Sequence, residues 1–232
     1  MTHQDALIAK ALYNDQFESF SGQQTAYPVL REFREKLHAT YLKDISHKRL
    51  LFIGCGDGHE CAGAIHQGAS VTGIDISEKA VEFASKKYPE ATFQVMDMAH
   101  LDFQGPSFDM IISLFSIMYI EPIVDVLINW KKVLQQGGHC LIAVPHPVRK
   151  MMRYSQGKYF VKGRQCEVWK GVERFGYYRL FEDYIRAFYA AGLTLIDMQE
   201  PEPVKENEMT QDSEVAYPHF LLFVLANEPS RI

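Results

Sequence analysis

The sequence predicts an α/β protein with a doubly wound, seven-stranded sheet, mostly parallel, with an antiparallel last strand and helices on both faces. Short apolar runs typical of buried parallel strands recur along the chain, and helix-compatible segments separate most of them. A turn with alternating glycines joins the first run to a helical segment. The long segment before the last apolar run carries no amphipathic helix, which indicates that the final strand inserts antiparallel.

Composition is that of one globular domain spanning residues 1–232, with 47% apolar and 23% charged residues and no internal repeat. A net charge of −5 argues against a general nucleic-acid binder, which needs a basic face. The four cysteines show no zinc-ligand spacing, so no metal is expected. The start lacks a signal-peptide pattern and the longest apolar run, Met110 to Ile120, is too short for a spanning helix. We therefore expect a cytoplasmic protein without membrane partners.

Residues 1–48 read as a helical prelude. Apolar residues from Leu7 to Leu12 recur at helical spacing, and a second helix is expected from Pro28 to about Leu42. Between them lies an aromatic and polar stretch, Tyr13 to Phe20, with weak periodicity.

The stretch from Arg49 to Gly58 organises the rest of the chain. A short apolar strand leads into a turn with glycines at every second position, Gly54, Gly56 and Gly58. Glycines at a strand-to-helix turn let a ligand approach the backbone closely. The next strand ends at Asp75, which a right-handed β-α-β unit brings beside the glycine turn. A carboxylate in that place can accept both hydroxyl hydrogen bonds of a ribose.

The glycine spacing separates two cofactor classes. A dinucleotide fingerprint has its third small residue five positions after the first glycine, where this chain has His59. The pattern G-x-G-x-G instead resembles motif I of the class I S-adenosylmethionine-dependent methyltransferases, in their small-molecule (methyltransferase-11/25-like) group. The resemblance covers about residues 45–226 and is strongest from 49 to 145. It implies a Rossmann-like sheet and S-adenosyl-L-methionine as cofactor, with S-adenosyl-L-homocysteine as product.

The remaining strands and helices follow in the same order. Ser77 is the expected N-cap of a helix that stops before Pro89. Pro122 falls in the first turn of another helix, which is expected to run to Leu134. The remaining strands are expected at 91–96, 108–114, 139–144, 193–198 and 218–225.

By this resemblance, the residues that contact the cofactor follow the strand ends. The set comprises the turn and the second strand end, the third strand end with its adenine contacts, and the fourth strand end beside the methionine part: Gly54, Cys55, Gly56, Gly58, Asp75, Ile76, Asp97, Met98, Ser113, Leu114 and Phe115. Tyr13 is a candidate lid residue over the cofactor, or a half-buried tyrosine that packs its helix. Asp97 could equally cap a loop.

Three residues are candidates for catalysis. The stretch from Phe108 to Tyr119 resembles the family's motif IV, F-D-x-I-x-S-x-x-S/A-x-x-Y/H, which implies that Tyr119 lies near the transferring methyl group. Tyr178 precedes a segment resembling the family's H-R-P/T-L-S-D-Y helix opening, where it replaces the usual histidine. His146 follows the fifth strand at the edge where such sheets bind ligands, so it is a candidate general base, or a turn residue between two prolines.

Residues 147–178 break the α/β pattern with aromatic and methionine side chains among basic residues and glycines. We interpret this segment as a β-rich insertion that covers an aromatic or apolar small-molecule acceptor. The alternative is a dimerisation surface, and the chain is expected to be a monomer or a homodimer.

The predicted function is methyl transfer by in-line displacement to an oxygen or nitrogen of a small molecule. Three alternatives stay open: a nicotinamide-dependent oxidoreductase, a nucleic-acid or protein methyltransferase, and a cofactor-binding scaffold without catalysis. The chain lacks the D/N-P-P-Y/F motif of base-amine methyltransferases, having Ser113-Leu-Phe-Ser at that place.

Overall fold

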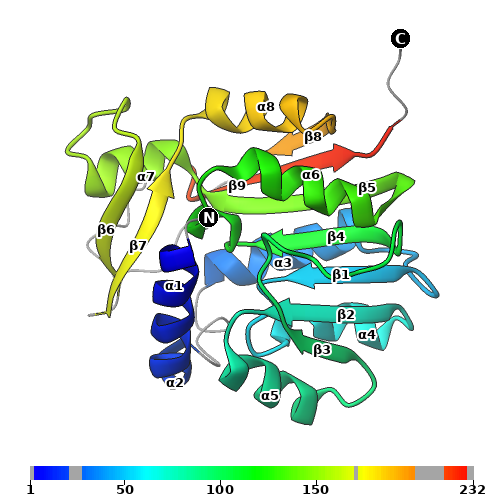
Figure 1. The fold of residues 1–232 in the computed structure, drawn as a ribbon. Helices are drawn as coiled ribbons and strands as arrows, with labels where there is room; N and C mark the ends of the chain where they lie inside the picture. The colour runs from blue at the N-terminus through cyan, green and yellow to red at the C-terminus, as the bar shows by residue number, and fades with distance from the viewer. Residues whose placement is uncertain (1–2, 21–27, 170–171, 202–216, 229–232) are drawn as a thin grey trace.

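A computed structural model describes residues 3–20, 28–169, 172–201 and 217–228. One seven-stranded sheet in the order β3-β2-β1-β4-β5-β9-β8 forms its centre (Figure 1). The strands are β1 (Arg49–Ile53), β2 (Ser70–Asp75), β3 (Thr92–Val95), β4 (Phe108–Leu114), β5 (Leu134–Pro145), β8 (Thr194–Gln199) and β9 (Phe220–Ala226). The first five are parallel, whereas β9 runs antiparallel to both β5 and β8. The predicted fold class, including the antiparallel last strand, is confirmed.

Helices cover both faces of this sheet. They are α1 (His3–Asp15), α2 (Phe17–Phe20), α3 (Pro28–Tyr41), α4 (Ala62–His66), α5 (Glu78–Lys87), α6 (Ile123–Val133), α7 (Pro147–Tyr154) and α8 (Phe181–Ala190), with single 3-10 turns η2 (His59–Cys61) and η3 (Ile117–Tyr119). None of them, within the described ranges, is long and apolar enough to cross a bilayer.

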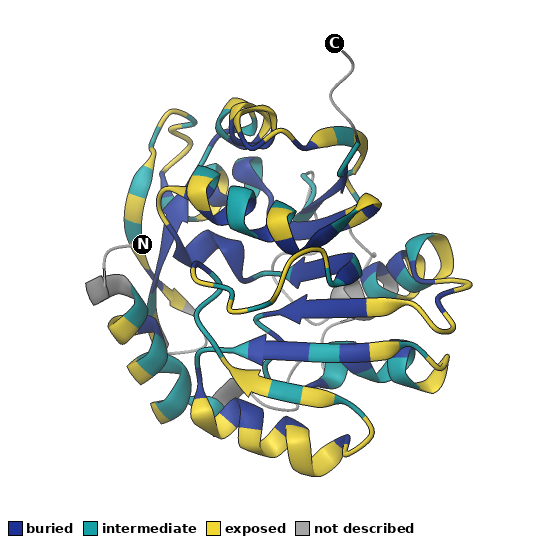
Figure 2. Ribbon diagram, turned by 45° about the vertical axis from the view of Figure 1, so that its right-hand side comes forward, coloured by how far each residue is buried: buried dark blue, intermediate teal, exposed yellow. Residues whose placement is uncertain are grey.

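Two apolar cores lie on opposite faces of the sheet because successive side chains of a strand point to opposite sides. On one face, α6 and α8 bury Trp130 and Phe188 against alternate residues of β1, β4, β5 and β9. On the other face, α3 and α4 pack against the intervening residues, including Phe33 of α3. Figure 2 shows the resulting buried central strands and the exposed outer surface of α5. Parallel strands covered on both sides explain the unbroken apolar runs of the sequence.

The helix and strand bounds differ from the expected ones at two places. The weakly periodic stretch after Tyr13 is helical, because α1 continues to Asp15 and α2 follows directly. The fifth strand begins at Leu134 rather than His139. Leu134 pairs with Phe108 across an irregularity in the β4–β5 ladder, so the strand starts before the Gly137-Gly138 pair rather than after it.

The segment 147–178 is not simply β-rich: it begins with the helix α7 and continues as the antiparallel hairpin β6 (Gly163–Trp169) and β7 (Val172–Tyr178). Pro147 takes the first helical position, where its fixed φ suits a helix and its missing N–H costs nothing. The His146 ring caps this helix by accepting from the Val148 N–H. The Pro-His-Pro sequence therefore starts a helix. The sequence analysis did not predict this helix because the residues around it are rich in aromatic side chains. Figure 1 shows α1, α7 and the hairpin at the edge to which the arrowheads of β1, β2 and β4 point.

Candidate active site

The glycine turn follows β1 in a conformation that only glycine adopts easily. Gly54, Gly56 and Gly58 have φ values of 70°, 52° and 76°. A Cβ at Gly54 would lie 2.4 Å from the Ser116 Cβ, and one at Gly58 would lie 2.9 Å from the Tyr88 ring. At Gly54 and Gly58 both the backbone conformation and the neighbouring side chains thus require glycine, whereas at Gly56 the positive φ does so.

Asp75 faces this turn, as the β-α-β argument predicted. Its Oδ2 accepts from the Gly56 N–H at 2.9 Å, and its Oδ1 accepts from the Ser77 N–H at 2.9 Å. Burial raises the pKa of the Asp75 carboxyl, although the N–H groups of Ser77, Gly56 and Ile76 oppose that shift. The Gly56 and Ser77 bonds go to different oxygens, and a carboxylate oxygen can accept more than one hydrogen bond. The two oxygens can therefore still receive two hydroxyl groups, which is what a ribose presents.

The glycine turn contains a buried thiol, that of Cys55. Cys55 donates its backbone N–H to the Ile74 carbonyl at 3.0 Å, and burial raises the pKa of its thiol. Cys55 is therefore a neutral, apolar wall of the turn, and not a nucleophile.

Asn14 fastens α1 to the start of α5, beside Asp75. Its Oδ1 accepts from the Ser77 hydroxyl at 2.6 Å and from the Lys79 N–H at 3.3 Å. Its Nδ2 donates to Glu78 at 2.7 Å, and Lys10 pairs with the same carboxylate. Sequence reasoning missed Asn14, although it lies within the polar stretch that it singled out. The contact places α1 over the carboxylate that is expected to hold the ribose.

Tyr13 and Tyr119 meet edge to face, with ring centroids 5.5 Å apart. Tyr119 makes a second such contact, at 5.6 Å, with Phe175 of the hairpin. Burial raises the pKa of both hydroxyls, so both stay protonated and can act only as donors or neutral acceptors near pH 7. The pair connects α1 to the hairpin, and the Asp75 charge acts on Tyr13.

The third and fourth strand ends are also fixed by local contacts. The Asp97 carboxylate accepts from the Ala99 N–H at 2.9 Å, which is the loop-capping alternative, and the Met98 carbonyl accepts from the Trp130 indole at 2.9 Å. These bonds hold the turn in place and leave the adenine contact of Asp97 and Met98 a prediction.

At the end of β4, the hydroxyls of Ser113 and Ser116 are 2.7 Å apart, and Ser116 donates to the Ile53 carbonyl at 3.0 Å. Leu114 packs against the core that contains α3. Phe115 then has φ of 59°, an unfavourable value for a side chain of this size. Such strain is kept where surrounding structure imposes it, often at ligand sites. Ser116 thus ties the end of β4 to β1, and the Phe115 N–H ties it to β5 by donating to the Ala143 carbonyl at 2.9 Å.

A group of buried charges lies where α7 meets the hairpin. Glu167 accepts from Lys150, pairs with Arg174 at 2.8 Å and receives the Tyr178 hydroxyl at 3.2 Å. We call Arg149, Lys150, Glu167 and Arg174 the basic cluster. Burial lowers the pKa of Lys150 to about 8, while its cationic neighbours hold the pKa of Glu167 below its ordinary value. From the sequence, Tyr178 was a candidate, the arginines and the lysine were only basic residues among aromatic ones, and Glu167 had no assigned role.

His146 caps the start of α7. Its Nδ1 accepts from the Val148 N–H at 3.1 Å and its Nε2 lies 2.8 Å from Glu200, so Nε2 carries the proton. Burial lowers its pKa, and the ring is 1% exposed. Both ring nitrogens are therefore engaged in this arrangement, which is that of a helix cap. The role of general base stays a prediction.

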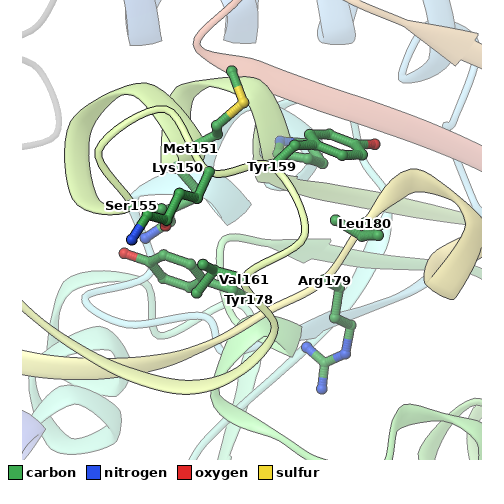
Figure 3. Close-up of a pocket in the computed structure, with 10 residues that line it drawn as sticks. Lys150, Met151, Ser155, Tyr159, Val161, Tyr178, Arg179 and Leu180 are labelled. Atoms are coloured by element: carbon green, nitrogen blue, oxygen red, sulfur yellow. The ribbon is translucent and has the colours of Figure 1, made fainter.

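A shallow pocket opens beside this cluster, between α7 and the end of β7 (Figure 3). The ammonium of Lys150 and the hydroxyl of Tyr178 lie together on one side, while the guanidinium of Arg179 points away from them. Arg179 instead donates to the Ile120 carbonyl, and so ties the end of β7 to the segment after η3.

The strand order, the antiparallel β9 and the acid opposite the glycine turn together define the class I methyltransferase fold. Residues 51–142 match the family model described as a methyltransferase domain.

Similar sequences and a similar solved structure carry methyltransferase or biosynthetic names. The chain is 31% identical over 104 residues to the biotin biosynthesis bifunctional protein BioHC of Cellvibrio japonicus, covering 44% of this chain and 21% of that protein. It is 30% identical over 106 residues to a demethylmenaquinone methyltransferase of Tropheryma whipplei, covering 44% of each. The chain thus spans less than half the length of these curated relatives. A structure of an S-adenosylmethionine-dependent methyltransferase from Mesorhizobium loti superposes with a TM-score of 0.70 at 25% identity, covering 83% of this chain and 96% of that one.

Proposed function

We propose that this protein is an S-adenosyl-L-methionine-dependent methyltransferase that acts on an oxygen or nitrogen of a small molecule. The observation that carries the proposal is the Asp75 carboxylate, which faces the glycine turn and has acceptor capacity left on both oxygens. When bound, the cofactor supplies a methyl group already activated on a sulfonium. The names of the relatives support a small-molecule acceptor, since one is a demethylmenaquinone methyltransferase.

In this proposal the residues of the chain hold and align the two reactants, because an in-line displacement depends mainly on proximity. Asp75 binds the ribose, the backbone from Gly54 to Gly58 follows the cofactor, and the turn from Ser113 to Phe115 supports its methionine end. Asn14 and Tyr13 close over it from α1. Tyr119, between Tyr13 and Phe175, and Tyr178 orient the acceptor.

The segment of α7 and the hairpin forms the acceptor side in this proposal. Its exposed apolar side chains, Met152, Phe160 and Val168, keep the alternative of a dimer surface open. The first experiment is calorimetric titration with S-adenosyl-L-methionine and, separately, with a nicotinamide dinucleotide. Binding of the first and not the second supports the proposal, and the reverse result would return the oxidoreductase alternative. Methyl transfer to phenols, carboxylates and heteroaromatic amines, followed by mass spectrometry, then identifies the acceptor class.

A further inference from the structure

The basic cluster brings more positive than negative charge into a poorly hydrated place. Lys150 and Glu167 are 9% and 4% exposed, and the side chain of Arg174 is 13% exposed. Glu167 acts on all three cations. Among the described residues of the cluster it is the single carboxylate, so one negative charge faces three positive ones. Buried cations are costly unless each is matched by an anion, so the imbalance calls for a reason.

Aromatic rings relieve part of this imbalance. The Lys150 ammonium lies 4.8 Å from the Tyr178 ring centroid and 5.0 Å from that of Tyr154. A cation–π contact offsets less free energy than the burial of an unmatched charge costs. The rings alone therefore do not account for the cluster.

Two donors in this region lack a partner among the described residues. The buried Nε of Arg149 donates no hydrogen bond there, and the buried hydroxyl of Tyr119 lies beside Tyr13 and Arg174 but meets neither in hydrogen-bond geometry. Tyr119 is 5% exposed, and the charges of both Arg174 and Glu167 act on its hydroxyl. A buried donor without an acceptor destabilises the folded protein. An acceptor brought by a ligand would remove that cost.

The side chains around the cluster can donate protons but are poorly suited to remove one. Tyr119 and Tyr178 have raised pKa values, the arginines are cations, and Glu167 is held ionised by its neighbours. The His146 nitrogens are both engaged. An acceptor that must lose a proton finds no evident base among these residues, whereas a carboxylate that receives a methyl group on its oxygen releases no proton.

We propose that the acceptor is a carboxylate-bearing small molecule whose anionic group is bound by Arg149, Lys150, Arg174 and Tyr119. This inference rests on the proposed function, since it takes the α7–hairpin side as the acceptor side. The carboxylate supplies the negative charge that the cluster lacks and oxygen acceptors for the two buried donors. Arg149 is the most informative residue, because Glu167 is already bonded to Lys150 and Arg174.

Matched carboxylate and amide probes test this inference without turnover. We would measure the melting temperature at pH 7 and fixed ionic strength with sodium acetate against acetamide, and with sodium benzoate against benzamide. Each pair differs in charge but hardly in shape. We expect at least one carboxylate to raise the melting temperature while its amide does not. Equal shifts within both pairs, including no shift at all, would overturn the inference.

Arg149→Met supplies the second measurement, because it keeps the apolar stem and removes the charge. We expect the apparent Kd for the protecting carboxylate to rise at least fivefold. The melting temperature without ligand should stay equal or increase, because the substitution removes one of three neighbouring positive charges. A structural ion pair at Arg149 would instead lower the ligand-free melting temperature, which contradicts the proposal. Arg186→Met, on the exposed side of α8, is the matched control and should change neither quantity.

Titration with S-adenosyl-L-homocysteine separates the two proposals. If S-adenosyl-L-homocysteine binds and the carboxylates do not, the inference about the acceptor fails while the proposed function stands. If the product does not bind, the proposed function fails, whatever the carboxylates do.

Discussion

At the scale of single residues, Asp75 is the sharpest determinant of the site. It combines a half-buried carboxylate with two backbone hydrogen bonds, one from Gly56 in the glycine turn and one from Ser77 after β2. Its position was predictable because strand order and handedness bring consecutive strand ends together, whatever the side chains do afterwards. The network around it, above all Asn14, was not predictable, since a contact 63 residues away in sequence leaves no local pattern.

Replacing Asp75 by alanine should weaken binding of S-adenosyl-L-homocysteine by about 1–3 kcal/mol, or roughly 5- to 150-fold, because the ribose hydroxyls would lose both acceptors. Calorimetric titration measures this directly. The exposed Asp102→Ala variant is the control for a general change of charge. Wild-type affinity in Asp75→Ala would contradict the assigned role.

Two substitutions of His146 distinguish a helix-capping role from a catalytic one. His146→Ala removes the side-chain acceptor at the start of α7 and should lower the free energy of unfolding by about 1 kcal/mol. His146→Asn offers an oxygen that can cap the same N–H and should restore most of that loss, as urea denaturation would show. As a general base, His146 would instead lose more than tenfold in turnover in both variants, with binding of S-adenosyl-L-homocysteine unchanged.

At the scale of helices and strands, the proposed function makes α1 a cover over the cofactor, and α7 with the hairpin the wall on the acceptor side. Sequence periodicity indicated the first of these, because helices at the start of the chain follow from apolar spacing alone. For the second, it indicated the β structure that the hairpin has but missed α7, because the aromatic residues of 147–178 resemble strand residues, whereas Pro147 and the His146 cap start a helix. Local capping geometry overrode composition there.

The α1 cover depends on Asn14, so Asn14→Ala should loosen it. We expect faster amide hydrogen exchange in residues 6–15 and a several-fold weaker binding of S-adenosyl-L-homocysteine, since Ser77 and the start of α5 lose their partner. Exchange in α6, on the other side of the sheet, serves as the internal reference. Unchanged exchange in residues 6–15 would show that α1 is held by other contacts.

The pairing of Glu167 predicts an acid dependence of stability. Its pKa is lower in the folded protein than the ordinary value of 4.5, because Lys150 and Arg174 favour the charged form over the cost of burial. This contribution is therefore present above pH 4.5 and is lost as the pH falls through the folded-state pKa. Glu167→Gln should lower the free energy of unfolding at pH 7 by about 3–5 kcal/mol, because it leaves buried cations unpaired.

Urea denaturation of both proteins at several pH values from neutral to acid measures this dependence. The difference between wild type and Glu167→Gln should shrink toward the acid end, where the wild-type carboxyl is protonated as well. Glu82→Gln, an exposed pair within α5, is the control. A difference that stays constant over the whole range would show that Glu167 contributes by packing alone.

At the scale of the whole molecule, the fold followed from the order of its elements. Three features of the sequence were sufficient to predict the sheet: its apolar runs, its glycine turns and the missing amphipathic helix before the last strand. The apolar runs are informative because strands covered on both faces must be apolar throughout. The acceptor side was not predictable in the same way. Ion pairs between α7 and the hairpin join residues whose partners are set by tertiary packing rather than by spacing.

The core around β9 should dominate overall stability. Phe223 is fully buried and contacts the rings of Tyr184 and Phe188 at 5.3 and 4.9 Å between centroids. Phe223→Ala should cost about 3–5 kcal/mol through lost burial and a residual cavity, a large share of the 5–15 kcal/mol typical of a domain. Chemical denaturation measures the loss. Phe160→Ala, at a side chain that is 80% exposed, should leave stability nearly unchanged.

The place of β9 also has a consequence for synthesis. It lies between β5 and β8, so β8 reaches the sheet only through a strand made some twenty residues later. Until β9 has been synthesised, the edge of β5 stays uncovered. Strands β1 to β4 can assemble without β9. Completion of the molecule thus waits for residues 220–226 to emerge, and a chaperone that shields the β5 edge would act on the nascent chain until then.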